Sequence, residues 1–401
     1  MGKNILLKMS RFEGKLLDFY QDNGQLWLFI FITISSLLLR NDLRIYNSTD
    51  FLHFLEPWGK FLEQNGGFKG IATLDSDYNA AYLYILAFLT YLPASLLAKI
   101  KVVSFIFEYA TAIIVMLIIR NIFILNKKSY LPYLGYGLVL FAPTLILNGA
   151  VWGQCDIIHT FFIVLSLYLL IKNKYTLSFI SFGFALAFKL QAIFFLPVLV
   201  LFYIKERKFS GLNFLLIPLT IFVVFLPAWA LGKPISDLFS VYFNQIGQYK
   251  SLVLNFSNIY SLIPDNYEYF HRSGIFISFA VLIGFYVLLS STKIKLKPAD
   301  YISIAMITVM ICTFFLPSMH ERYMFTADIL AVLYFFLVPN QYFVPLLIWF
   351  INVNAYYPFL FQFGPIIDFR IMALVYLGLL VFLIMYTFKS KTIPQTSMEA
   401  G

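Results

Sequence analysis

The sequence predicts an all-α, polytopic membrane protein, and its composition is the first observation that points there. Of the 401 residues, 61% are apolar and 12% are charged, whereas soluble domains usually have about 45–50% apolar and about 25% charged residues. The mean hydropathy is +0.81. These values exclude a soluble globule, a disordered chain and a nucleic-acid-binding domain. The net charge of +9 is therefore interpreted as the basic excess of cytoplasmic loops.

The lengths of the apolar runs are the second observation. A helix crosses about 30 Å of hydrocarbon in about 20 residues, so runs of roughly this length predict about twelve crossings, between eleven and thirteen. These runs lie at 25–40, 102–122, 131–149, 156–172, 176–188, 190–205, 211–231, 273–292, 300–316, 323–338, 341–355 and 367–388. A further run, 80–98, either crosses or enters and leaves the membrane on the same side.

The third observation is the distribution of charge, which assigns the two sides of the membrane. If the N-terminus is cytoplasmic and the run 80–98 does not cross, 17 basic residues lie inside and 12 outside, while 14 of the 20 acidic residues lie outside. A crossing at 80–98 would turn the later basic loops outward, against the positive-inside rule. We therefore predict one re-entrant or surface-lying segment at 80–98, with both termini in the cytoplasm.

Two long loops then face the extracytoplasmic side of a single domain, 1–401, which we expect in the plasma membrane. The first loop spans 41–101 and the second spans 233–272, and both are rich in aromatic and polar residues. Long loops held on a rigid scaffold are where binding and catalytic residues gather. We therefore expect the function to be carried at this face.

The first loop opens with an amphipathic pattern. Its apolar residues at 51, 54, 55, 58, 61 and 62 recur at helical spacing. They predict a helix on the membrane surface that ends at the Gly66-Gly67 pair. Asp50 lies at the N-terminal end of this helix, either as an N-cap or as a functional carboxylate. Further on, Asp75 and Asp77 precede the next apolar run, and capping explains only one of them.

Another group of polar residues follows the run 131–149. Trp152 suits the aromatic belt of a membrane interface, and Gly153 suits a turn. Gln154 comes next, and Asp156 shares one helix face with the polar side chains three and four residues later. A helix corner with an Asp cap explains this pattern as well as a functional site does.

Ionisable residues inside apolar sequence are functional candidates by default. Lys189 interrupts an apolar stretch and is followed by Gln191. Snorkelling of the lysine to the interface is the alternative. Glu108 lies within the run 102–122, and we expect it to face protein or water rather than lipid.

The stretch 316–323 is the most informative short segment. Ser318 and Glu321 form an S-x-x-E capping box, which predicts the start of an outward-facing helix. His320 and Arg322 would then lie in the first turn, where the helix dipole already favours anions. They are interpreted as a phosphate seat, and pairing with nearby acids is the alternative.

Taken together, these motifs resemble the GT-C glycosyltransferases. The resemblance rests on an acid in the first outer loop, Trp-Gly-Gln-x-Asp at 152–156, Lys-x-Gln at 189–191 and His-Glu-Arg at 320–322. It is to the branch that uses dolichyl-phosphate hexoses, which includes GPI mannosyltransferases, the glucosyltransferases of N-glycosylation and bacterial relatives. It covers roughly residues 25–340.

The resemblance implies a polyprenyl-phosphate-hexose donor, a glycan or glycolipid acceptor, and an inverting transfer at the extracytoplasmic face. The family's first-loop aspartate corresponds to Asp50, and its second acidic position corresponds to Asp77. Two departures matter. The family's His-Glu-Lys is His-Glu-Arg here, which keeps the charge but changes its geometry. The Asp-Tyr-Pro-Pro of some relatives is Asp-Tyr-Asn-Ala at 77–80.

The charges suggest how such a site would work. Asp50 would take the proton from the acceptor hydroxyl as general base. His320, Arg322 and Lys189 would hold the lipid phosphate without a metal. The residues expected to bind the sugar or to support the loops are Asp77, Tyr78, Gln154, Asp156, Gln191 and Glu321. No cofactor is expected, because the sequence has no His/Cys cluster with metal-ligand spacing, no Walker loop and no dinucleotide glycine pattern, although the two first-loop aspartates would suit a divalent ion.

Two other functions stay open from the sequence. A flippase or secondary transporter of a lipid-linked glycan would place charged or broken-helix sites near the middle of the membrane, where only Glu108 is a candidate. A structural membrane protein would leave the outer acids and the His-Glu-Arg motif unexplained. Tyr242, Phe243 and Tyr249 in the second loop are candidates for stacking on sugar rings.

Overall fold

The computed structural model describes residues 11–125, 128–244, 249–291 and 296–392, which are mostly helical. The first part of the chain forms α1 (Arg11–Asp22), α2 (Gly24–Leu43), the π-helix η1 (Phe51–Leu55), α3 (Glu56–Gln64), the 3-10 helix η2 (Gly67–Ala72), α4 (Ala80–Thr90) and α5 (Leu96–Ile122).

The middle of the chain forms α6 (Leu131–Leu140), α7 (Pro143–Ile146), the π-helix η3 (Leu147–Trp152), α8 (Asp156–Ile171), α9 (Tyr175–Phe188), η4 (Leu190–Phe195), α10 (Leu196–Glu206), η5 (Gly211–Leu215), α11 (Leu216–Ala230) and α12 (Ile235–Asn244). The last part forms β1 (Val253–Leu254), η6 (Ile259–Leu262), α13 (Tyr267–Ser291), α14 (Pro298–Phe315), β2 (Met319–His320), α15 (Phe325–Leu337), η7 (Pro339–Gln341), α16 (Phe343–Phe361) and α17 (Phe369–Thr392).

The helices confirm an all-α polytopic membrane protein but not the count of twelve crossings. Within the described residues, seven helices are long and apolar enough to cross a membrane, or eight if the pair α6 and α7–η3, bent by 45°, is one span. Four further apolar helices, α4, α8, α9 and α15, are shorter. The 11 residues of α4 span about 16 Å at 1.5 Å per residue, so α4 alone does not cross about 30 Å of hydrocarbon.

The core is formed by helices that are apolar on all sides. Helix α15 packs against α14, α16, α8 and α6, and nearly all of its side chains are buried. Helix α14 packs in turn against α13 and α17. A helix that is hydrophobic all round is stable only when neighbours surround it, so α14 and α15 take the central positions and α2 and α13 stay peripheral.

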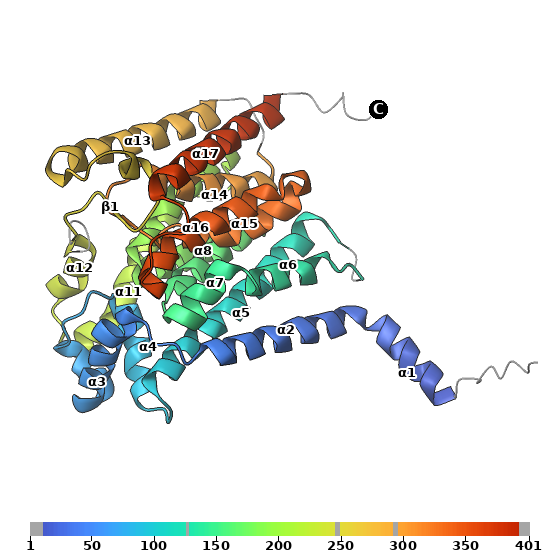
Figure 1. Cartoon of the computed structure of the whole chain (residues 1–401), viewed down its shortest axis with the longest axis horizontal. Coiled ribbons are helices and arrows are strands. Elements are labelled where there is room, and N and C mark those ends of the chain that lie inside the picture. The colour runs from blue at the N-terminus through green and yellow to red at the C-terminus, as the bar shows by residue number, and fades with distance from the viewer. Residues whose placement is uncertain (1–10, 126–127, 245–248, 292–295, 393–401) are drawn as a thin grey trace, which may run out of the picture.

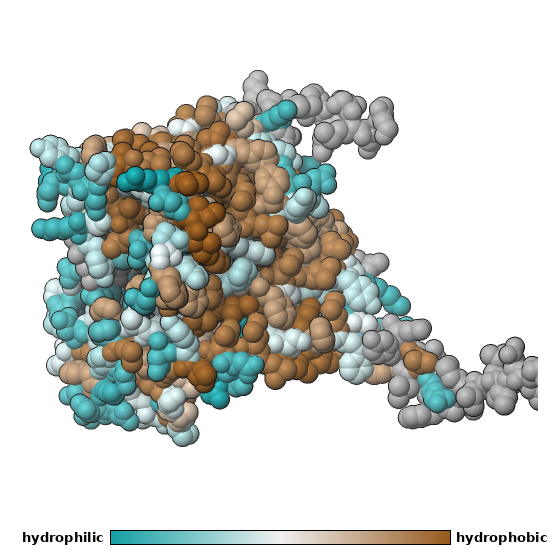
Figure 2. Space-filling model, in the orientation of Figure 1, coloured by the Kyte–Doolittle hydropathy of each residue, from teal (hydrophilic) through white to brown (hydrophobic). Residues whose placement is uncertain are grey.

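Both ends of the described chain lie at the same end of this bundle. The helix α1 and the C-terminal end of α17 stand on the right of Figure 1, while α3, α12 and β1 gather on the left. We call the end with α3 and α12 the loop end. Hydrophobic residues cover the middle of the visible surface in Figure 2, and hydrophilic residues gather at the loop end.

The amphipathic helix predicted after Asp50 is present as η1 and α3. It ends where Gly66 takes a left-handed conformation with φ of 77°, which glycine adopts without a steric penalty. Ser48 caps its start, because the Phe51 backbone N–H donates to the Ser48 Oγ at 3.2 Å. Asp50 makes no capping hydrogen bond, so capping does not explain this carboxylate.

The two long loops are more structured and slightly shorter than their predicted bounds. The first predicted loop, 41–101, holds η1, α3, η2 and α4, but its last residues belong to α5, which begins at Leu96. The second, 233–272, holds α12, β1 and η6, and α13 already begins at Tyr267.

The prediction of a capping box formed by Ser318 and Glu321 is wrong. Ser318 has φ of +58°, which is incompatible with a helix N-cap, and α15 begins only at Phe325. Instead, β2 (Met319–His320) pairs in parallel with β1 (Val253–Leu254), and the Ser318 Oγ donates to the Ser251 carbonyl at 2.8 Å. Tertiary pairing with a segment more than 60 residues away therefore outweighs the local capping signal.

Candidate functional site

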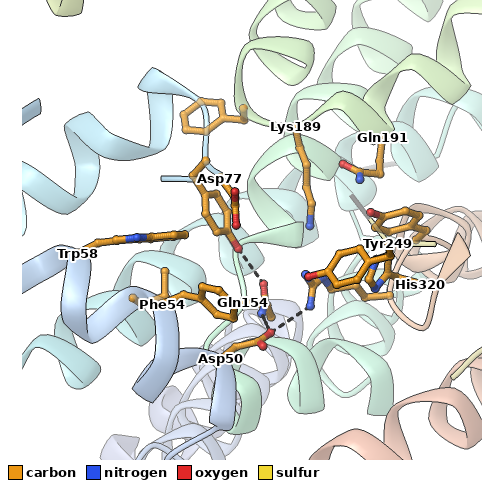
Figure 3. Close-up of a pocket in the computed structure, with 14 residues that line it drawn as sticks. Asp50, Phe54, Trp58, Asp77, Gln154, Lys189, Gln191, Tyr249 and His320 are labelled. Atoms are coloured by element: carbon orange, nitrogen blue, oxygen red, sulfur yellow. Dashed lines mark hydrogen bonds and ion pairs between the residues drawn. The ribbon is translucent and has the colours of Figure 1, made fainter. Parts of the chain in front are cut away.

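A cleft at the loop end brings together side chains from five distant parts of the sequence, which are the first loop and the segments around residues 154, 190, 249 and 321. Its space is about 740 Å³, the open mouth included. The lining residues are Asp50, Phe54, Leu55, Trp58, Asp77, Tyr78, Gln154, Phe188, Lys189, Gln191, Tyr249, His320, Arg322 and Tyr323. In Figure 3 the labelled polar side chains point into a common space between the ribbons.

Asp50 is held at the floor of this cleft by three donors. Its Oδ2 accepts hydrogen bonds from Trp152 Nε1 at 3.0 Å, from Gln154 Nε2 at 2.5 Å and from Arg322 Nη1 at 3.1 Å. Among the described residues, no side chain donates to the Asp50 Oδ1. The donors therefore fix the orientation of the carboxylate and leave one oxygen for a ligand.

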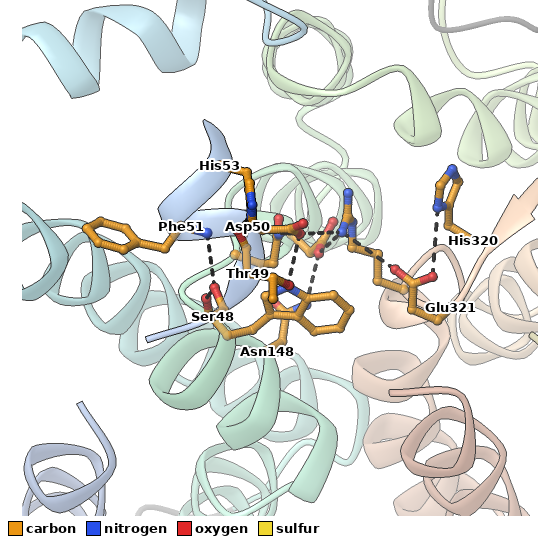
Figure 4. A network of polar contacts seen from close by, with 12 residues as sticks. Ser48, Thr49, Asp50, Phe51, His53, Asn148, His320 and Glu321 are labelled. Atoms are coloured by element: carbon orange, nitrogen blue, oxygen red, sulfur yellow. Dashed lines mark hydrogen bonds and ion pairs between the residues drawn. The ribbon is translucent and has the colours of Figure 1, made fainter. Parts of the chain in front are cut away.

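The backbone around residues 147–154 supplies two of these donors. The π-helix η3 ends at Gly153, whose φ of +77° is left-handed, as the sequence predicted for a turn. This reversal lets the side chains of Trp152 and Gln154 meet the same carboxylate oxygen. The Ser48 Oγ also donates to the Trp152 carbonyl at 2.7 Å. The first loop is therefore hydrogen-bonded to this segment through both Ser48 and Asp50, which are labelled in Figure 4.

Trp152 corrects a prediction. It was expected in the aromatic belt of a membrane interface, but its side chain is fully buried. Its ring stacks on Phe359 with a centroid distance of 4.7 Å and meets Tyr356 edge-on at 5.3 Å. A buried indole N–H needs an acceptor, and the Asp50 carboxylate supplies it. Trp152 therefore packs through its ring and satisfies its N–H at the same time.

Arg322 is the centre of charge in the cleft. Its Nη1 lies 3.1 Å from Asp50 Oδ2 and 3.5 Å from Glu321 Oε1, and its Nε lies 3.9 Å from Asp156 Oδ2. The guanidinium carbon is 5.5 Å from the centroid of the Trp152 ring. A planar guanidinium on an aromatic face and among three carboxylates is strongly oriented.

Glu321 is a buried counter-ion rather than a lining residue. Burial raises the pKa of its carboxyl, but hydrogen bonding to His320 and the charge of Arg322 outweigh burial and leave the pKa below its ordinary value of 4.5. The His320 Nδ1 lies 3.8 Å from Glu321 Oε2. Glu321 therefore holds the Arg322 guanidinium and the His320 imidazole from behind, in the direction away from the cleft.

Asp156 has the same role for Lys189. The Lys189 ammonium makes an ion pair and hydrogen bond to Asp156 Oδ1, and the Asn148 amide donates to Asp156 Oδ2 at 2.9 Å. Asp156 is 1% exposed and does not line the cleft. Lys189 does line it and is paired with Asp156, so snorkelling, the alternative interpretation, does not describe this residue.

The opposite wall of the cleft comes from the end of the first loop. The Tyr78 hydroxyl donates to Gln154 Oε1 at 3.1 Å, and the Trp58 ring meets the Tyr78 ring edge-on at 5.4 Å. Burial raises the pKa of Tyr78 well above its usual value, which keeps the phenol a hydrogen-bond donor. Asp77, which is exposed, lies beside it.

His320 and Tyr249 form the rim beside Arg322. The imidazole of His320 packs edge-on against the Tyr249 ring at 4.8 Å and near the Tyr323 ring at 5.0 Å. Tyr249 thus lies where an aromatic side chain of the second loop was expected. Tyr242 does not line the cleft, and its hydroxyl donates instead to the Leu186 carbonyl at 2.9 Å.

One polar stripe that supports the site was not identified from the sequence. Lys101, Ser104 and Glu108 share one face of α5 at positions i, i+3 and i+7, and all are buried. The Lys101 ammonium donates to the Tyr46 carbonyl at 2.6 Å and to the Val151 carbonyl at 3.2 Å. It therefore ties the entry of the Asp50 loop to the segment 147–154.

The other two residues of the stripe continue the same support. The Ser104 hydroxyl donates to the Gln154 carbonyl at 2.8 Å. Glu108 makes a fully buried ion pair with Arg40 at 2.5 Å, which confirms that Glu108 faces protein rather than lipid. The helical spacing of three polar residues in an otherwise apolar helix was the signal that could have revealed them together.

The arrangement has the parts of a group-transfer site for an anionic substrate. One oriented carboxylate, Asp50, shares a cleft with two cations, Arg322 and Lys189, and with the His320 imidazole, and the walls of the cleft are aromatic. Eight of the ten predicted site residues line the cleft, and only Asp156 and Glu321 stand behind it. In the described part of the chain, no group of three or more His, Cys, Asp or Glu side chains is placed to hold a metal ion.

No family model and no curated protein matches the chain.

Proposed function

We propose that the protein is an inverting hexosyltransferase that moves a hexose from a polyprenyl-phosphate donor to a glycan or glycolipid acceptor. The observation that carries this proposal is the contact between Asp50 and Arg322 inside one cleft, with Lys189 and His320 beside it. Such a cleft offers one base and several phosphate ligands. The GT-C resemblance of the motifs points to the same chemistry.

The step requires one bond to form and one to break. The acceptor oxygen attacks the anomeric carbon, its proton passes to the free Oδ1 of Asp50, and the bond between the anomeric carbon and the phosphate oxygen breaks. The leaving lipid phosphate takes the electron pair, and Arg322, Lys189 and His320 stabilise its charge. A single displacement of this kind inverts the anomeric configuration.

An apolar groove next to the cleft supports a lipid-linked donor. It encloses about 590 Å³, its mouth included, and is lined by residues of η4, α10, α13 and α14, among them Ile193, Phe194 and Phe279. The same short helix η4 contributes Gln191 to the cleft and Ile193 to the groove. A molecule with an anionic head and a hydrocarbon tail would fill both sites at once.

The test is transfer of radiolabelled hexose from a defined panel of polyprenyl-phosphate hexoses by the purified protein. Asp50→Asn removes the base and should reduce transfer by at least about 100-fold, as loss of a general base does. Asp42→Asn is the matched control, because Asp42 is an exposed carboxylate of the same region that does not line the cleft. Near-normal transfer by Asp50→Asn would refute the assignment of the base.

A flippase or secondary transporter of a lipid-linked glycan is the second candidate. The buried Arg40–Glu108 pair within α2 and α5 favours it, since ionisable residues inside spans often mark a transport path. Against it, this pair is closed on itself, and the charges that line a cavity gather at the loop end. Translocation of the labelled lipid between leaflets without transfer would select this function.

A further inference from the structure

A second cavity adjoins the cleft at the loop end. It encloses about 1200 Å³, its mouth included, and lies between the segment 72–77 and the segment 232–244, which contains α12. Asp77 lines both this cavity and the cleft. The two cavities therefore meet at Asp77, and a chain-like molecule in the second cavity would extend to the first.

Lys233 holds the two walls of this second cavity together. It comes from the turn after α11 and is 8% exposed. Its ammonium donates to the Leu74 carbonyl at 2.8 Å and to the Ile71 carbonyl at 3.4 Å. These two hydrogen bonds tie the segment after α11 to the first loop. The Lys233 ammonium therefore points at backbone carbonyls of the first loop.

The lining of the second cavity consists mainly of groups that bind hydroxyls. Thr73, Ser76 and Ser240 bring hydroxyls, and Asp75 and Asp237 bring exposed carboxylates. Both carboxylates lie near enough to Lys233 to act on it: burial lowers the pKa of its ammonium, and Asp237 and Asp75 partly oppose that effect.

The two cavities differ in the balance of their charges. The lining of the cleft sets Arg322 and Lys189 against Asp50 and Asp77, and its two cations suit a phosphate. In the second cavity the carboxylates of Asp75, Asp77 and Asp237 outnumber the single ammonium of Lys233. A polyanion would be repelled there, whereas carboxylates accept hydrogen bonds readily from the hydroxyls of an uncharged sugar.

We propose that the second cavity binds the acceptor, and that the acceptor is an uncharged, hydroxyl-rich glycan chain whose reacting end reaches the cleft past Asp77. This inference rests on the transferase function proposed above. The binding that it asserts needs neither donor nor transfer, so it is measured separately.

Two serines on α12 offer a matched pair of variants. Ser240 lines the cavity, and Ser236, one turn earlier on the same helix, is exposed and does not line it. Ser240→Trp fills the cavity, while Ser236→Trp adds the same side chain outside it. Asp237→Lys reverses one charge of the lining without filling the space and is read instead if Ser240→Trp does not fold.

The experiment is saturation-transfer-difference NMR on the full-length protein in nanodiscs. The probes are uncharged trisaccharides (mannotriose, maltotriose and cellotriose) and, as the polyanion, a short polyglycerol phosphate. At least one trisaccharide should bind the native protein and Ser236→Trp equally and bind Ser240→Trp at least tenfold more weakly. Polyglycerol phosphate should bind the native protein only at the phosphate ligands of the cleft, so Ser240→Trp should not weaken its binding, whereas Asp237→Lys should strengthen it.

Three results would overturn the inference. These are equal trisaccharide binding by both Trp variants, binding of no trisaccharide by the native protein, and polyglycerol phosphate binding that Ser240→Trp weakens at least tenfold. Binding of a polyprenyl-phosphate hexose is measured on the same samples. If that binding persists and depends on Arg322, such a result refutes only the acceptor site. If it is absent as well, the transferase proposal fails too.

Discussion

Replacing Arg322 by alanine removes the group that joins the acids of the cleft to one another. Arg322 is 19% exposed at its side chain and lies within 4.0 Å of Asp50, Asp156 and Glu321. After its removal, Lys189 still pairs with Asp156 and His320 still faces Glu321. Asp50, however, loses its ion pair and keeps only the donors from Trp152 and Gln154.

Two magnitudes follow from this geometry. Breaking a buried ion pair from one side destabilises a protein by about 3–5 kcal/mol. We expect a value of about 3 kcal/mol, because Lys189 still pairs with Asp156 and the His320 imidazole still lies beside Glu321. A charge-assisted hydrogen bond to phosphate contributes about 1.5–3 kcal/mol. Its loss would raise the Kd of a polyprenyl-phosphate hexose by about 10- to 150-fold.

The assay is direct binding of a polyprenyl-phosphate hexose to the purified variant, with thermal unfolding measured on the same sample. Arg322→Lys keeps the charge without the planar fork and should restore part of the affinity. Arg44→Ala is the matched control, because Arg44 is exposed and its Nε donates only to Asn41. Unchanged donor affinity in a folded Arg322→Ala protein would refute the phosphate seat.

Three further predictions concern the supports of the site. Lys101→Met should lower the transfer rate at least tenfold with little change in donor Kd, because it releases the Tyr46 and Val151 carbonyls. The control is Lys99→Met, a half-buried neighbour on α5 whose ammonium donates to the Leu92 carbonyl at 3.0 Å, and an unchanged rate in Lys101→Met would contradict a positioning role. Gly149→Ala should lower the melting temperature in a thermal scan by several degrees, since its Cβ would overlap Glu108 Oε1 and overpacking costs about 1–3 kcal/mol; a native melting temperature would contradict this packing. The lowered pKa of Glu321 predicts a stabilisation that is complete above pH 4.5 and is lost as the pH falls through the lower pKa of the folded state. Glu321→Gln should therefore reduce the loss of stability at acid pH in a stability–pH curve. An unchanged loss would argue against the ion pairs.

The sequence was sufficient for features that depend on local patterns. Helical spacing predicted the surface helix after Asp50, and the glycines at 66 and 153 marked turns that the structure contains as left-handed residues. Lys189 was recognised because a charge in apolar sequence needs a reason. Arg322 was singled out as a cation in the first turn of a helix predicted to start at Ser318, although the helix begins only at Phe325. These inferences required only composition and period, which are properties of neighbouring residues.

The failures all involve partners far apart in the chain. The capping box predicted at Ser318 does not form, because β2 pairs with β1 instead. Trp152 is buried rather than interfacial, because its N–H donates to Asp50 and its ring stacks on Phe359. The pairing of Arg40 with Glu108 joins residues 68 positions apart, and no periodicity encodes such a pair. The number of spans also could not be counted from length, because helices buried in a bundle, such as α15, are shorter than a lone span.

The most direct measurement is the fate of the label when purified native protein is given a polyprenyl-phosphate [¹⁴C]hexose and an uncharged oligosaccharide acceptor. The account predicts that the label moves to the acceptor and that NMR of the product shows an anomeric configuration opposite to that of the donor. Label that stays on the lipid, on either leaflet, or a product with retained configuration would contradict it.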